Sequence, residues 1–233
     1  MKILFSLSLL LSVSLCFSQN QAGFKEIKSS NLNSQIIAKQ QINDLHSGAL
    51  LVRLKTGKNS IDALLKSGKT ELAKKKQEQI DQENHRIIQA FKSQFNFCQV
   101  YFFYSDDSKF VKENNLDEVC FIDENLQKLN NFKIEFDKFL IAEFGNVKGD
   151  TSKYYSHSEL KTTANFSQES QSTYYGGGST DAKGLIIKDQ NFIQLRKPFP
   201  YFAKYPFFRR ISKQEIYTVK RMNKNLWSFL KNN

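Results

Sequence analysis

The chain has 233 residues, of which 34 are Lys or Arg and 23 are Asp or Glu, giving a formal net charge of +11. A hydrophobic content of 40%, with 13% aromatic residues, can bury a core and excludes a wholly disordered protein. The three cysteines form no Cys-x-x-Cys pair, which excludes a disulfide-dense scaffold, a zinc finger and a dithiol redox motif. Only one long apolar run occurs, which excludes a polytopic membrane protein.

Residues 1–18 predict a cleaved secretory signal peptide. A positive start is followed by an apolar run over residues 3–17, too short for the roughly 20 residues of a spanning helix. Small residues at Cys16 and Ser18 place the cut at the Ser18–Gln19 bond, so the protein is expected to be exported, either periplasmic or extracellular. Acylation of Cys16 is the alternative, but Leu15 is too bulky for a lipoprotein signal, so lipid anchoring is disfavoured.

Residues 19–47 are rich in Gln, Asn and Ser and predict a polar N-terminal arm. A short helix around residues 32–45 is compatible with its apolar spacing. Residues 48–233 have the composition of a folded unit and predict a single globular domain.

The first half of this domain alternates strand and helix signals. Residues 49–55 predict a strand, and apolar residues at helical spacing over residues 61–95 predict a long helix that Gly68 divides in two. Residues 97–104 are aromatic and β-branched, which is the strongest strand signal in the chain, and residues 118–122 predict the next strand. A short helical crossover between them predicts that these two strands are parallel.

The second half begins with a predicted strand at residues 139–144. Residues 145–184 are rich in Ser, Thr, Tyr and Gly and predict a flexible loop, either functional or a surface insertion without a role. Residues 185–195 predict a β-hairpin. The chain closes with a helix for which Ser212 and Glu215 predict a capping box.

These elements predict an α/β or α+β fold. A single mixed sheet of about five or six strands would be flanked by the long helix and by a basic, amphipathic C-terminal helix. The element order, βαβαβ followed by a hairpin and a helix, loosely resembles the thioredoxin-like arrangement. The Cys-x-x-Cys motif of that arrangement is absent, so the resemblance implies no redox activity.

The positive charge is concentrated at the C-terminus. Residues 196–233 carry ten basic side chains and one acidic side chain, whereas residues 19–195 are nearly neutral. At 100° per residue the final helix gathers basic and aromatic side chains on one face, roughly 130° from its apolar stripe. The predicted anion-binding residues are Arg209, Arg210, Lys213, Lys220, Arg221, Lys224 and Lys231, and the predicted aromatic contacts are Tyr217 and Trp227.

Two cysteines survive the predicted cleavage. Cys98 and Cys120 lie in apolar, strand-forming stretches of a chain expected in an oxidising compartment. They could form a disulfide worth about 3 kcal/mol, or they could remain buried as free thiols. The sequence leaves both alternatives open, because it supplies no separation between the two Cα atoms.

The candidates for catalysis are few. Asp106, Asp107 and Asp123 follow two predicted strands, and parallel strands would bring these carboxylates to one edge of the sheet. The alternative is that these residues only form turns. His157, in the Tyr-rich loop, is the histidine best suited to acid–base chemistry. No spacing typical of a metal site or of a cofactor motif occurs, so neither a metal nor a cofactor is predicted.

The sequence therefore predicts an exported, non-catalytic binding or accessory protein of the cell envelope or exterior. Its basic C-terminal helix would engage an anionic surface, either lipid headgroups or acidic polysaccharide. The alternative for the helix is a solvated basic face without a ligand. Nucleic acid is disfavoured as a partner because the protein is expected outside the cytoplasm and carries no nucleic-acid motif, and no protein partner is identified. The alternative function is a secreted hydrolase with a carboxylate site at the strand ends, where Asp106, Asp107, Asp123 and Glu124 would act either alone or with a divalent metal ion.

Overall fold

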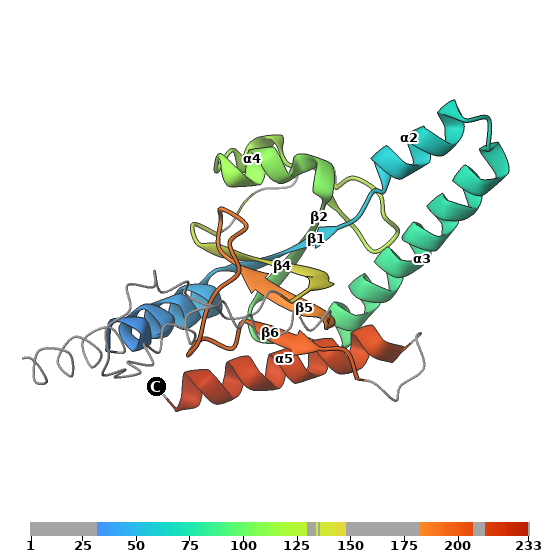
Figure 1. Ribbon diagram of the computed structural model, residues 1–233. Helices are drawn as coiled ribbons and strands as arrows, with labels where there is room; N and C mark the ends of the chain where they lie inside the picture. Colours follow the sequence, from blue (N-terminus) through green and yellow to red (C-terminus); the bar gives the residue numbers. More distant parts are fainter. Residues whose placement is uncertain (1–31, 130–133, 135, 148–181, 207–212, 233) are drawn as a thin grey trace, which may run out of the picture.

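The computed structural model describes residues 32–129, 134, 136–147, 182–206 and 213–232. A helix over residues 32–47 precedes the first strand, as predicted for the arm. The elements that follow are β1 (Ala49–Leu54), α2 (Lys58–Lys66), α3 (Thr70–Gln94), β2 (Gln99–Tyr104), α4 (Ser108–Lys112), β3 (Phe121–Ile122), β4 (Phe139–Asn146), β5 (Lys183–Lys188), β6 (Phe202–Lys204) and α5 (Gln214–Lys231). The mixed α/β fold is confirmed (Figure 1).

One sheet contains six strands in the order β3-β2-β1-β4-β5-β6. The central strands β2, β1 and β4 are parallel, whereas β3, β5 and β6 join antiparallel to their neighbours. The mixed sheet and its strand number agree with the prediction. Gly68 separates α2 from α3 as expected, because its φ of +72° is a backbone conformation that residues with a Cβ rarely adopt.

The predicted parallel pairing of residues 97–104 with residues 118–122 is wrong. β3 forms only at Phe121 and Ile122, and it pairs antiparallel with Phe103 and Phe102 of β2. The physical reason is the length of α4, whose five residues rise about 7 Å, against about 20 Å along the six-residue β2. The connection therefore returns to the sheet at the end where it left.

The predicted hairpin at residues 185–195 forms only in part. β5 ends at Lys188, and Asp189 Oδ1 accepts hydrogen bonds from the backbone N–H groups of Asn191 and Ile193. Beyond this turn a single bridge joins Lys188 to Gln194, and the longer partners of β5 are β4 and β6. The prolines that follow remove the backbone donors that a longer second strand would need.

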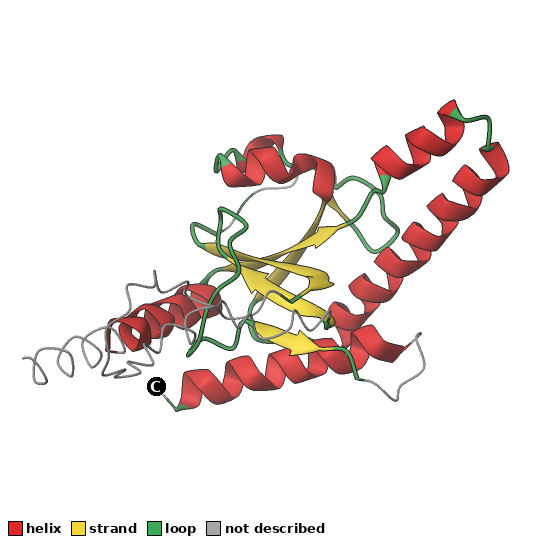
Figure 2. Cartoon of the chain, in the orientation of Figure 1, coloured by secondary structure: helices red, strands yellow, loops and turns green. Residues whose placement is uncertain are grey.

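The two faces of the sheet are covered unequally (Figure 2). The larger core packs the helix at residues 32–47, α3 and α5 against one face. A smaller core packs α4 against the other face, around Leu51, Phe103 and Ile141. The second half of the arm is therefore part of the folded domain, since Ala38 and Ile42 of its helix are fully buried.

Several predicted features lie outside the described residues. These are the signal peptide over residues 1–18 with Cys16, residues 19–31 of the arm, and most of the predicted loop, from 148 to 181, with His157. β4 extends to Asn146, and β5 starts at Lys183.

Candidate functional site

Helix α5 is amphipathic, as its sequence predicts. Val219, Met222 and Leu226 are fully buried against α3 and the sheet. Ile216 and Leu230 lie half-buried beside this stripe. Because the stripe faces the core, the opposite side of α5 points away from the domain.

Glu215 joins α5 to α3 through an ion pair. The helix starts at Gln214 without a side-chain cap, and Ser212 lies outside the described residues. The Glu215 carboxylate is only 4% exposed and accepts a 3.3 Å hydrogen bond from Arg86 Nε of α3. Burial, with a contribution from Glu215, raises the pKa of Tyr205 nearby. The predicted capping box involves Ser212 and therefore stays a prediction, whereas the buried Glu215 carboxylate has a cationic partner in Arg86.

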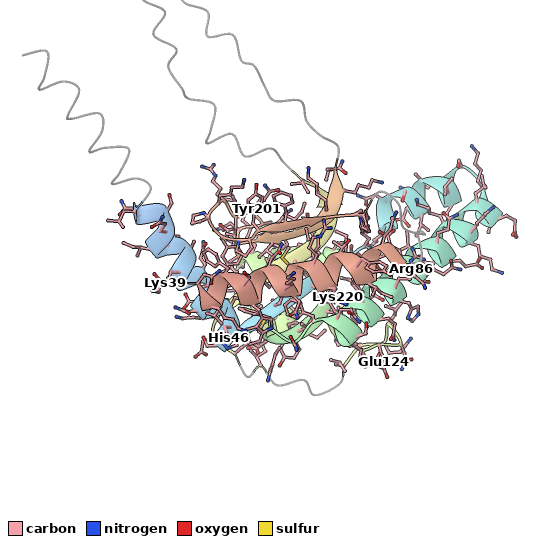
Figure 3. All side chains as sticks on the ribbon, turned by 90° about the horizontal axis from the view of Figure 1, so that it is seen from below. Lys39, His46, Arg86, Glu124, Tyr201 and Lys220 are labelled. Carbon is pink, nitrogen blue, oxygen red and sulfur yellow. The ribbon has the colours of Figure 1, made fainter. Side chains whose placement is uncertain are left out.

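The outward side of α5 carries five exposed cations. We call them the basic face: Lys213, Lys220, Arg221, Lys224 and Lys231. Within the described ranges none of the five pairs with a carboxylate, whereas Lys92 and Lys138 elsewhere on the surface do. Tyr217 is exposed on the same side, as predicted. Figure 3 shows Lys220 on this surface, and the predicted Arg209 and Arg210 lie outside the described residues.

Trp227 does not belong to this face. It is half-buried, and its indole Nε1 donates a 3.0 Å hydrogen bond to Asn96 Oδ1. Its ring lies 5.1 Å from the Phe97 ring and 5.2 Å from the His46 ring. The segment after α3 and the helix at residues 32–47 both pack against this flank of α5, so Trp227 has internal partners, and its role as an outward contact stays a prediction.

The three carboxylates predicted as catalytic candidates accept hydrogen bonds from neighbouring groups of the chain. Thr56 Oγ1 donates a 2.7 Å hydrogen bond to Asp106, and the Cys120 backbone N–H donates a 2.9 Å bond to Asp107. Asp123 Oδ1 accepts 2.8 Å hydrogen bonds from the backbone N–H groups of Asn125 and Gln127, and the bond from Gln127 is the main cause that lowers the pKa of Asp123. Because β3 is antiparallel to β2, Asp123 lies away from the carboxyl end of β2.

No group of three or more His, Cys, Asp or Glu residues that could hold a metal ion occurs in the part of the chain that the structure describes. The turn-forming interpretation of these carboxylates accounts for their contacts.

Cys98 and Cys120 are both free and half-buried. Both pack against the larger core. Burial raises the pKa of Cys98 to about 12, against an opposing effect of a backbone hydrogen bond at Leu50. Of the two alternatives, the structure therefore has free thiols, and Cys98 packs as a small apolar residue.

We expect Cys98 to resist alkylation in the folded protein. A pKa near 12 in place of the ordinary 9.0 makes the thiolate roughly a thousandfold scarcer at pH 8. Treatment with iodoacetamide, followed by peptide mass spectrometry, should label Cys98 only after unfolding in urea. Labelling of the native protein at the rate of a free thiol in solution would contradict this.

A charged cluster that the sequence analysis missed lies on the opposite face of the sheet. Glu143 of β4 accepts a 2.9 Å hydrogen bond from Arg53 of β1 and a second hydrogen bond from Lys188 of β5. Arg53 also donates 2.8 Å to Ser108 Oγ, and its guanidinium lies 5.4 Å from the centre of the Phe192 ring. Burial opposes ionisation of Glu143, but the hydrogen bonds from Lys188 and Arg53 outweigh it and lower its pKa.

The sequence contains a signal for this cluster. Arg53 and Glu143 are each the single charged residue of their strand. A charge in such a strand needs a partner, because burial without one is costly. Which two charges would meet depended on the register of β1 against β4, which no local pattern specifies.

Comparisons with known proteins give no relative. No family model matches the chain, no curated protein matches it, and no solved structure matches it. The thioredoxin-like element order therefore stays a prediction from sequence. Within the residues that can be described, no helix is long and apolar enough to cross a membrane.

Proposed function

We propose that the protein is an exported, non-catalytic binding or accessory protein that engages an anionic surface through the basic face of α5. The observation that carries the proposal is the set of five exposed cations without carboxylate partners among the described residues. Cations that lack internal counter-ions leave a positive potential that attracts polyanions. The buried stripe and the Arg86–Glu215 pair hold this potential in a fixed direction.

Among the described residues, the predicted carboxylates of the hydrolase alternative do not come together in one site. Asp106, Asp107 and Asp123 each accept hydrogen bonds from neighbouring groups, and the antiparallel β3 separates Asp123 from the other two. The Arg53–Glu143–Lys188 cluster is an ion-paired set in which the carboxylate is held ionised by two cations. Such pairing stabilises charge and leaves Glu143 a poor general base.

The combined substitution Lys220→Glu, Arg221→Glu and Lys224→Glu is expected to abolish binding to anionic vesicles. Each cation near an anionic membrane contributes about 1 kcal/mol, so reversal of three predicts a loss of more than about a hundredfold in affinity. Co-sedimentation with anionic vesicles across a salt series measures this loss of affinity. Wild-type binding should weaken as the salt concentration rises.

A matched control changes the net charge equally at another place. Lys74, Lys75 and Lys76 are exposed on α3, and their replacement by Glu should leave most binding intact. Equal losses in the two variants would show that overall charge, and not the basic face, attracts the partner. Binding retained by the α5 variant would refute the proposal.

A further inference from the structure

The helix at residues 32–47 presents unburied apolar side chains at its first turns. Leu32 is 58% exposed, Ile36 57% and Ile37 55%. Farther along the same helix Ala38, Ile42 and Leu45 are buried in the larger core. We call Leu32, Ile36 and Ile37 the apolar tip. Leu32 and Ile36 lie one helical turn apart and Ile37 follows directly, so three large aliphatic side chains are exposed within two turns. Neighbouring exposed apolar side chains are typical of contact sites.

The apolar tip is held in a fixed relation to the basic face. At the other end of its helix the His46 ring lies 5.2 Å from the Trp227 ring of α5, and His46 Nδ1 hydrogen-bonds to the Phe97 backbone oxygen at 2.8 Å. From this junction the helix runs past the C-terminal end of α5, so that the tip projects beyond it (Figures 1 and 3). Lys39 lies beside that end of α5 in Figure 3 and adds a further cation.

We propose that the apolar tip inserts into the interface of a lipid bilayer whose anionic headgroups are attracted by the basic face. This inference rests on the proposed function and selects the lipid surface as the anionic partner. A bilayer offers both an anionic surface and an apolar layer below it, whereas an acidic polysaccharide offers charge alone. Interfacial helices bury their apolar side chains into the headgroup and acyl boundary in this way.

The variant Leu32→Ser/Ile36→Ser/Ile37→Ser tests the insertion. All three side chains are exposed, so the substitutions leave the packed core untouched. We expect partitioning of the exported form, with its N-terminus determined by mass spectrometry, into vesicles of phosphatidylglycerol and phosphatidylcholine to weaken at least about tenfold. Binding to a soluble acidic polysaccharide such as alginate should stay unchanged.

Insertion also has a signature of its own. The wild type should raise the surface pressure of a phosphatidylglycerol monolayer, and the triple serine variant should not. The matched control is Leu65→Ser/Leu72→Ser, which removes comparably exposed leucines from α2 and α3 at the other end of the molecule. This control should behave as the wild type in both assays.

The outcomes separate the inference from the function beneath it. Wild-type partitioning by the serine variant, or an equal loss of vesicle and alginate binding, would overturn the role of the apolar tip. Vesicle binding that survives the α5 charge reversal but not the serine substitutions would overturn the proposed function, while the insertion of the apolar tip would remain supported. Loss in both variants, with alginate binding lost only in the α5 variant, is the expected pattern.

Discussion

Replacing Glu143 by Gln is expected to destabilise the protein by about 2 kcal/mol at neutral pH. The change removes the one carboxylate between Arg53 and Lys188, so two cations that it neutralises remain on the sheet without a counter-charge. Breaking a fully buried pair costs about 3–5 kcal/mol, and the one-third exposure of the Arg53 side chain reduces that value. Urea unfolding followed by circular dichroism measures the difference.

The effect of this substitution should depend on pH. The pKa of Glu143 lies below its ordinary value of 4.5, so its ionised form contributes stability above that pH. This contribution is lost as the pH falls through the lowered pKa, when the carboxyl takes up a proton. The stability gap between the wild type and Glu143→Gln should therefore be full at pH 7 and shrink below pH 4.5.

An exposed ion pair supplies the comparison. Glu83 pairs with Lys55 at 3.0 Å, with side chains 31% and 57% exposed. Glu83→Gln should cost less than about 1 kcal/mol, because a solvated pair contributes little. If the two Gln variants lost equal stability, the partial burial of the Arg53–Glu143–Lys188 cluster would have no energetic consequence.

Local patterns predicted most of the fold. The strands β1, β2 and β4 follow from short apolar, aromatic or β-branched runs, and the helices α3 and α5 follow from apolar residues at period 3.6. These patterns are properties of each segment alone. The direction of β3 was mispredicted because strand direction depends on how the connection crosses the sheet, and no residue in the strand encodes it. The cluster at Glu143 was missed for the same reason, since its three members, Arg53, Glu143 and Lys188, come from three different strands.

The candidate site shows where helical periodicity stops being informative. Helical spacing assigns Lys220, Lys224 and Trp227 to one face, and the two lysines are exposed as expected. A period gives the angle of a residue around its own helix but not the width of the surface that neighbours cover. Trp227 lies at the margin, where Asn96 and Phe97 reach α5, and tertiary packing decides its role.

Replacing Trp227 by Ala is expected to lower stability by about 3 kcal/mol while leaving the binding of anionic vesicles intact. The substitution removes the ring packed between Phe97 and His46 and the hydrogen bond to Asn96, which together join α5 to the rest of the fold. Urea unfolding must be followed by circular dichroism, because Trp227 is the single tryptophan of the chain.

The matched comparison is Tyr217→Ala, which removes an aromatic side chain from the exposed side of the same helix. This variant should lose less stability than Trp227→Ala, because the Tyr217 side chain is more exposed than that of Trp227. The reverse result, stability kept but vesicle binding lost in Trp227→Ala, would restore the outward role that helical spacing predicted.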